Sequence, residues 1–252
     1  MSTSSAPDDE FSPSPGSVTI VGTAHVSPES LDELRATIDR ENPDVVAVEL
    51  CGRRYLGPTP DGVPHAGAVS PGIRTLLFLP LMQYLQARTA KERGLDPETT
   101  DMSAAIEAAI ETDANLVLLD RDILATFERY WSNASIREHL RVIASIGLAI
   151  VRGDSTLLNT SSPKRETDDD VVDEYRETTK RRFPAFRTVF LDERDELMAA
   201  RLAYLEREGY DTVAVVGAAH KPGIADALDQ RATEVETIST PLIDPRPDIS
   251  SA

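Results

Sequence analysis

The stretch that decides the fold occurs twice: VTIVGTAH runs from Val18 to His25, and VAVVGAAH runs from Val213 to His220. The two copies are identical at five of their eight positions. Each is a short apolar run, typical of a parallel strand buried on both faces, that stops at a glycine and reaches a histidine three residues later. The pattern predicts that both histidines follow carboxyl ends of strands, where open α/β sheets bind ligands.

Further apolar runs extend the predicted sheet. They predict strands at residues 45–48 and 116–119 and an edge strand at residues 235–238. Apolar residues at helical spacing predict helices at residues 28–40, 102–111, 123–129, 194–208 and 223–231. The alternation indicates an α/β fold with a central, mainly parallel sheet. We expect this sheet to be built from two similar halves, each consisting of a strand, a Gly-x-x-His segment and a helix.

The middle of the chain interrupts this alternation. Residues 57–72 are rich in Pro and Gly and residues 159–170 are polar and acidic, so both are predicted loops. Residues 73–93 and 127–153 have apolar helical patterns and are expected to form a helical cap insertion. The expected organisation is a disordered acidic tail over residues 1–16, one α/β domain over 17–240 with cap and loops within roughly 57–190, and a C-terminal tail over 241–252.

The charge excludes one class of partner and indicates a habitat. With 43 Asp and Glu against 26 Lys and Arg, the formal charge of -17 repels nucleic acid. Such an acidic surface, with arginine as its main cation, is typical of a halophilic archaeon, where salt screens the repulsion. The single cysteine, Cys51, allows no internal disulfide and favours a cytoplasmic location. No apolar run reaches the roughly 20 residues of a transmembrane segment, and a homodimer is compatible with the sequence.

Charged residues follow two more of the predicted strands. Glu49 comes directly after the second strand, and Asp120 ends the third, with Arg121 and Asp122 behind it. Two imidazoles and a carboxylate that meet at one sheet edge predict a divalent metal site with His25, Glu49 and His220 as ligands. The alternative is that the histidines only cap the strand ends by hydrogen bonds to the backbone.

Five ordered blocks carry a resemblance to a known family: GTAHVSPES, PDVVAVEL followed by RRY, LLDRDILATFERYW, LDERDELMAARL and VVGAAHKPGI. With these blocks the sequence resembles the TraB/PrgY pheromone-shutdown family, which is related to the TIKI metalloproteases and to the ChaN and erythromycin-esterase-like superfamily. The resemblance implies a two-halved α/β fold. It also implies a site formed by His25, Glu49, Arg194 and His220.

The resemblance implies a metal-dependent hydrolase that cleaves a peptide or small amide. In this reading Mn, Co or Zn is held by His25 and His220, and Glu49 is either the third ligand or the base on the attacking water. Arg194 faces the developing oxyanion or a substrate carboxylate, or else it forms an ion pair with Asp120 or Glu193.

Other charged residues around the predicted site are assigned supporting roles. Asp122 is expected to cap a helix. The residues expected to surround the site are Arg54, Asp120, Arg121, Glu193 and Asp195. The alternative function is a non-catalytic peptide- or haem-binding regulatory module that uses the same cleft.

Overall fold

A computed structural model describes residues 14–23, 28–56, 72, 75, 101–152, 169–231 and 238–246. In this part of the chain, four parallel strands form one sheet in the order β1-β4-β2-β3. The strands are β1 (Val18–Thr23), β2 (Val45–Val48), β3 (Asn115–Leu118) and β4 (Thr212–Gly217). The predicted parallel α/β sheet is therefore confirmed, and β3 begins one residue earlier than predicted.

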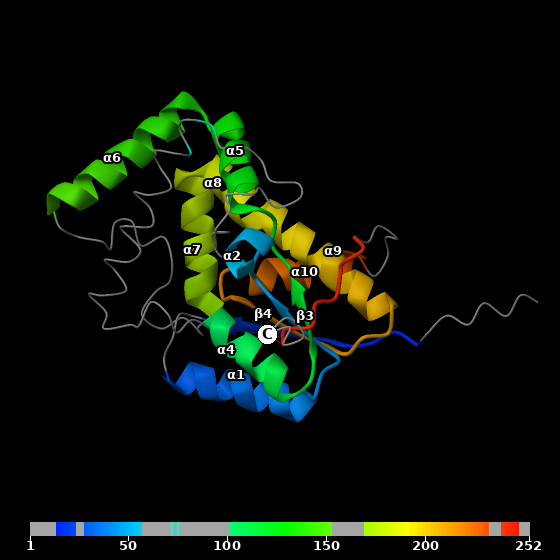
Figure 1. The fold of residues 1–252 in the computed structure, drawn as a ribbon. Helices are drawn as coiled ribbons and strands as arrows, with labels where there is room; N and C mark the ends of the chain where they lie inside the picture. The colour runs from blue at the N-terminus through cyan, green and yellow to red at the C-terminus, as the bar shows by residue number, and fades with distance from the viewer. Residues whose placement is uncertain are drawn as a thin grey trace, which may run out of the picture.

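Helices cover both faces of this sheet (Figure 1). The early helices are α1 (Pro28–Glu41), α2 (Gly52–Leu56), α4 (Asp101–Glu111), α5 (Ile123–Asn133) and α6 (Ile136–Arg152). The later ones are α7 (Asp169–Arg182), α8 (Pro184–Arg187), the π turn η2 (Thr188–Asp192), α9 (Glu193–Arg207) and α10 (Lys221–Arg231). None of the helices described here has the length and apolar character needed to cross a bilayer.

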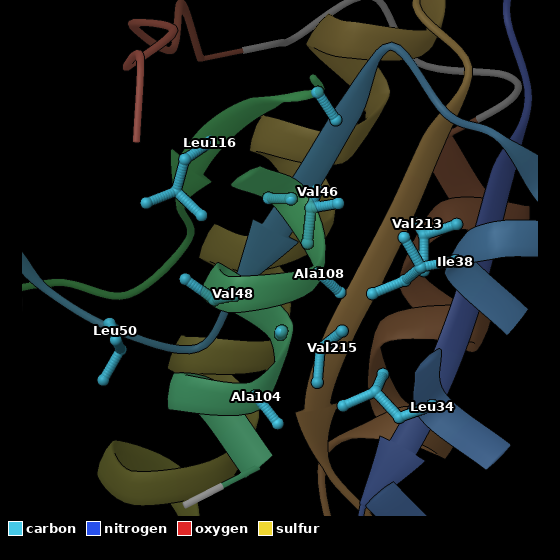
Figure 2. Packing of buried hydrophobic residues seen from close by; sticks show 13 residues of the cluster. Leu34, Ile38, Val46, Val48, Leu50, Ala104, Ala108, Leu116, Val213 and Val215 are labelled. Atoms are coloured by element: carbon cyan, nitrogen blue, oxygen red, sulfur yellow. The ribbon is translucent and has the colours of Figure 1, made fainter. Parts of the chain in front are cut away.

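The two faces of the sheet bury alternate residues of the same strands, as the pleat requires. Figure 2 shows one face, where side chains from β2 and β4 meet α1 and α4. The labelled residues there are Leu34, Ile38, Val46, Val48, Leu50, Ala104, Ala108, Leu116, Val213 and Val215. On the opposite face Val45, Ala47, Ala214 and Val216 pack against Met198 and Leu202 of α9 and Ile224 of α10. Burial on both faces explains why these strands are apolar throughout.

The two strands of the repeated pattern, β1 and β4, are neighbours in the sheet. Gly22 pairs with Val216 and Thr23 with Gly217, so the register is shifted by one residue from the alignment of the two sequence copies. The N–H of Ala218 donates to the carbonyl of Thr23 at 2.8 Å, which joins the two strands at their carboxyl ends. His25 lies outside the described residues. An origin of the sheet in two similar halves stays a prediction.

Two secondary-structure predictions are wrong, and parts of others lie outside the described residues. Ile238, the described end of the predicted edge strand, is not in a strand; the extra pairing is an antiparallel bridge between Leu116 and Ile243. Asp169, predicted as loop, begins α7. Residues 57–71, 73–74, 76–93, 153, 159–168 and 235–237 of the predicted loops, cap and edge strand lie outside the described residues.

Helix α7 was not predicted because its buried face is mostly polar. Among the side chains of α7 from residue 172 onward, Val172, Arg176 and Thr179 are buried, at helical spacing, and only the first of them is apolar. A search for apolar periodicity therefore misses the helix. Arg176 is buried because its guanidinium binds Asp195 at the carboxyl edge of the sheet.

Candidate functional site

Charged side chains gather at the carboxyl edge of the sheet. Glu49 follows β2, Asp120 lies two residues beyond β3, and His220 lies in the turn between β4 and α10. Arg194 and Asp195 come from the first turn of α9. Asp120, Arg194, Asp195 and His220 are all buried, with exposed fractions of 5%, 9%, 2% and 5%. Four residues that the sequence places around the predicted site thus meet with Glu49 in one buried cluster.

The guanidinium of Arg194 lies at the centre of this cluster. Its Nε and Nη2 donate to the two carboxylate oxygens of Asp120, each at 3.0 Å, and Nη2 also donates to Glu49 Oε1. Its Nη1 donates to the carbonyl of Phe190 and lies 3.1 Å from His220 Nε2. Burial alone would lower the pKa of Arg194, but Glu49 and Asp120 outweigh it and raise the pKa. Arg194 is therefore a permanent buried cation.

A π turn carries Arg194 into this position. In η2 the N–H of Glu193 reaches the carbonyl of Thr188, five residues back. The carbonyls of this turn also accept side-chain bonds: Phe190 from Arg194 at 3.1 Å and Val189 from Arg121 Nη2 at 2.8 Å. Single π turns within helices occur often at functional sites because they re-aim the residues that follow. Here the helical run from α8 to α9 delivers Glu193, Arg194 and Asp195 to the sheet edge.

The contacts of His220 define which ring nitrogen carries its proton. Because a guanidinium only donates, the 3.1 Å contact between Arg194 Nη1 and His220 Nε2 is a hydrogen bond only if Nε2 is an unprotonated acceptor. The proton of the neutral ring then sits on Nδ1, which donates to Asp195 Oδ1 at 2.6 Å. In this tautomer of the neutral ring the lone pair of Nε2 faces Arg194, whereas a protonated ring would place an N–H opposite Glu49 Oε1 at 3.3 Å.

Glu49 is held in its ionised form. Its Oε2 accepts the N–H of Gly217 at 2.7 Å, and its Oε1 lies 3.3 Å from His220 Nε2. Burial alone would raise the pKa of Glu49, but the positive charge of a protonated His220, the guanidinium of Arg194 and the Gly217 N–H together lower it to about 2. A β-carbon at position 217 would lie 3.2 Å from Oε2, so the glycine of the second Gly-x-x-His segment makes room for this carboxylate.

Arg176 is a residue of the cluster that the sequence did not indicate. Its Nη1 and Nη2 donate to Asp195 Oδ2 at 3.0 and 3.1 Å, and Nη1 also donates to the carbonyl of Ala219. A β-carbon on Gly223 would overlap Asp195 Oδ2 and crowd Arg176 Nη2. Gly223 lies in the first turn of α10, where residues with a higher helix propensity are expected. This glycine is the one feature of the sequence that indicates a close contact at this position.

Other predicted site residues form supporting ion pairs. Arg121 donates to Glu193 at 2.9 Å, and Arg129 binds the same carboxylate through both oxygens at 2.6 and 2.7 Å. Asp122 caps α5 by accepting the N–H of Leu124 at 2.7 Å, as predicted, and also accepts from Arg53. Arg54 is exposed on α2.

Comparison with known proteins identifies the family. The model of the TraB/PrgY/gumN family matches residues 12–237. The chain belongs to this family. An uncharacterized protein of Methanocaldococcus jannaschii is 29% identical over 83% of the chain and 52% of its own length, so the chain spans about half of that relative. TraB domain-containing proteins of Homo sapiens and Mus musculus are 26% and 27% identical, each over 91% of the chain and 68% of their own length.

Two of the three metal ligands predicted for this TraB-family chain, Glu49 and His220, are among the described residues. Glu49 and His220 do lie together, and a carboxylate on Nδ1 is common for histidines that bind metals. However, Arg194 already bonds Glu49 Oε1 and His220 Nε2, so an ion at these atoms would face a fixed positive charge. With Arg194 in this position the described residues do not fit a bound metal, and no group of three ligands occurs among them. The third predicted ligand, His25, lies outside them.

Proposed function

We propose that this TraB-family protein is a hydrolase that cleaves a peptide or small amide at the cluster of Glu49, Arg194 and His220. The observation that supports it is the environment of His220 Nε2. This lone pair lies 3.1 Å from a buried cation and 3.3 Å from a partly buried carboxylate, while Nδ1 is held by Asp195. An imidazole oriented by a carboxylate is a common general base in hydrolases.

In the proposed reaction His220 Nε2 takes a proton from the attacking water. The new Nε2–H then faces Glu49 Oε1, and Asp195 keeps its bond to Nδ1, so two carboxylates stabilise the imidazolium. Arg194 Nη1, released from Nε2, donates to the substrate carbonyl oxygen and stabilises the negative charge that develops there. His220 finally gives its proton to the leaving amine, which balances the reaction.

Several finer points remain proposals. A divalent ion held by His25, Glu49 and His220, with Mn, Co and Zn as the ions to test, would require Arg194 to turn away from Nε2. The family match supports TraB membership and says nothing of the substrate. The cytoplasmic location, the homodimer and the halophilic origin also stay predictions of the sequence.

The test is cleavage of a synthetic peptide library in water enriched in oxygen-18, read by mass spectrometry. Hydrolysis places one heavy oxygen in each new carboxylate. We expect His220→Gln and Glu49→Gln to lower the rate by roughly 10²–10⁴-fold, the usual worth of a general base. His139→Gln is the matched control, because His139 stacks on Trp131 within the helical layer and does not belong to the cluster.

Parallel reactions with a chelator and with added Mn, Co or Zn separate the two mechanisms. Cleavage that is unaffected by the chelator supports an arginine-centred site. Cleavage that is lost with the chelator and restored by one ion supports the metal proposal. If wild-type protein releases no labelled carboxylate under any of these conditions, the proposed function is wrong.

A further inference from the structure

We propose that Arg176 is a positioning residue that holds Asp195 so that Asp195 fixes the proton of His220 on Nδ1. The inference rests on the proposed function, because it concerns the base of that reaction. Arg176 comes from α7, which no sequence pattern connected to the site. It touches neither Glu49 nor His220 in any contact described above, so its effect on His220 must pass through its partners, Asp195 and the carbonyl of Ala219.

The two oxygens of Asp195 have separate partners. Oδ1 faces His220 Nδ1 at 2.6 Å, and Oδ2 accepts both Arg176 Nη1 and Nη2 at 3.0 and 3.1 Å. Two donors of one planar guanidinium on a single oxygen restrict the rotation of the carboxylate about its χ angles. The plane that they select is the one in which Oδ1 meets the imidazole. Arg176 therefore sets the direction of the Asp195–His220 bond.

A second contact ties Arg176 to the turn that carries His220. Its Nη1 donates to the carbonyl of Ala219, the residue directly before His220. One side chain thus fixes both the carboxylate and the backbone next to the imidazole. Arg176 and Asp195 are buried, with exposed fractions of 8% and 2%, so removing the arginine would leave a buried carboxylate without its cation.

A glycine in the neighbouring helix leaves space for this pair. A β-carbon at Gly223 of α10 would overlap Asp195 Oδ2 and approach Arg176 Nη2 to 2.6 Å. Both groups are the ends of side chains, so an alanine would be accommodated by moving them. Gly223→Ala is therefore a change that displaces the pair without removing a charge or a hydrogen-bonding atom.

The experiment is nitrogen NMR of the histidine rings in the full chain, without substrate. The sequence has four histidines, so His220 can be assigned from the one signal set that is missing in His220→Gln. In wild type we expect Nδ1 to be protonated and Nε2 to be an acceptor. Asp195→Asn, Arg176→Gln and Gly223→Ala should each change the His220 nitrogen shifts toward a mixture of the two tautomers.

Arg176→Lys should retain a larger population of the wild-type His220 tautomer than Arg176→Gln. A lysine ammonium keeps the positive charge but cannot reproduce the two hydrogen bonds of the planar guanidinium to Asp195. Arg35→Gln is the control, because Arg35 pairs with Glu107 at 2.9 Å between α1 and α4. A purely structural arginine would lower stability in Arg176→Gln and leave the His220 shifts unchanged, which would overturn the proposal. So would a wild-type proton on Nε2.

Assays of the same variants with the peptide library test the role of Arg176 separately from the proposed function. If wild type cleaves, Arg176→Gln should lower the rate about tenfold or more through His220, with partial recovery in Arg176→Lys. If wild type does not cleave any peptide, the proposed function fails while the tautomer measurement still decides the role of Arg176. Wild-type cleavage that Arg176→Gln leaves unchanged would contradict the positioning role.

Discussion

The carboxylate of Glu49 contributes a stability that depends on pH. Burial opposes its ionisation, yet a protonated His220, the guanidinium of Arg194 and the Gly217 N–H lower its pKa from 4.5 to about 2. Because the pKa is lower in the folded state than in the unfolded chain, the stabilisation is complete above the unfolded value. It is lost as the pH falls through the interval between the two values.

Glu49→Gln should therefore reduce the free energy of unfolding most at neutral pH. A shift from 4.5 to about 2, which includes the charge of a protonated His220, corresponds to at most about 3 kcal/mol, and the difference between wild type and variant should shrink as the pH falls below about 4. Urea unfolding at about pH 7, 5 and 3 measures it. Glu107→Gln, which removes an exposed pair, is the control. A difference that stays constant with pH would contradict this account of Glu49.

At the level of single residues, the strand pattern predicted which residues lie at the sheet edge, whereas the helix residue Arg194 was assigned to the site through the family resemblance. Glu49, Asp120 and His220 follow strands, and parallel strands bring their carboxyl ends to one edge. The ion pair of Arg194 with Asp120, one of two predicted alternatives, is present. Arg176 could not be predicted, because a lone arginine in a polar segment carries no periodic signal.

At the level of elements, the cap of α5 shows how a strand end is connected to the helical layer. Asp122 accepts the N–H of Leu124 at 2.7 Å and the Nε of Arg53 at 3.1 Å. Asp122→Ala should cost about 1 kcal/mol of stability and lower Tm by about 2–4 °C. Asp122→Asn, which keeps an acceptor for Leu124, should lose less. Thermal unfolding followed by circular dichroism measures both, and equal losses would contradict the capping role.

The π turn η2 was not predicted from the sequence. The spacing of apolar residues predicted a helix only from residue 194, although the helical run begins at Pro184. Within this run, Phe190 stacks on Phe186 at 4.5 Å and meets Phe127 edge-on at 5.2 Å. Aromatic packing against neighbouring helices stabilises a turn that local propensity does not specify, so its position follows from tertiary contacts.

At the level of the whole molecule, the formal charge of -17 should make stability depend on salt. Repulsion among surface carboxylates destabilises the compact state, and the Debye length falls from about 10 Å at 0.1 M to about 3 Å at 1 M. We expect Tm to rise by several degrees when NaCl is increased over this range. The same ionic strength reached with KCl should have the same effect, whereas an equal osmolality of glycerol would not screen charge. A Tm that falls with salt would contradict this expectation.

The order β1-β4-β2-β3 has a consequence for how the chain is made. The described hydrogen-bonding partner of β1 is β4, whose residues lie 194 positions further along the chain. During synthesis, which proceeds from the N-terminus, β1 cannot pair with β4 until the long segment between the two strands has left the ribosome. The carboxyl end of β1, Gly22 and Thr23, is therefore made well before β4 and pairs with Val216 and Gly217 only after the chain between them has been synthesised.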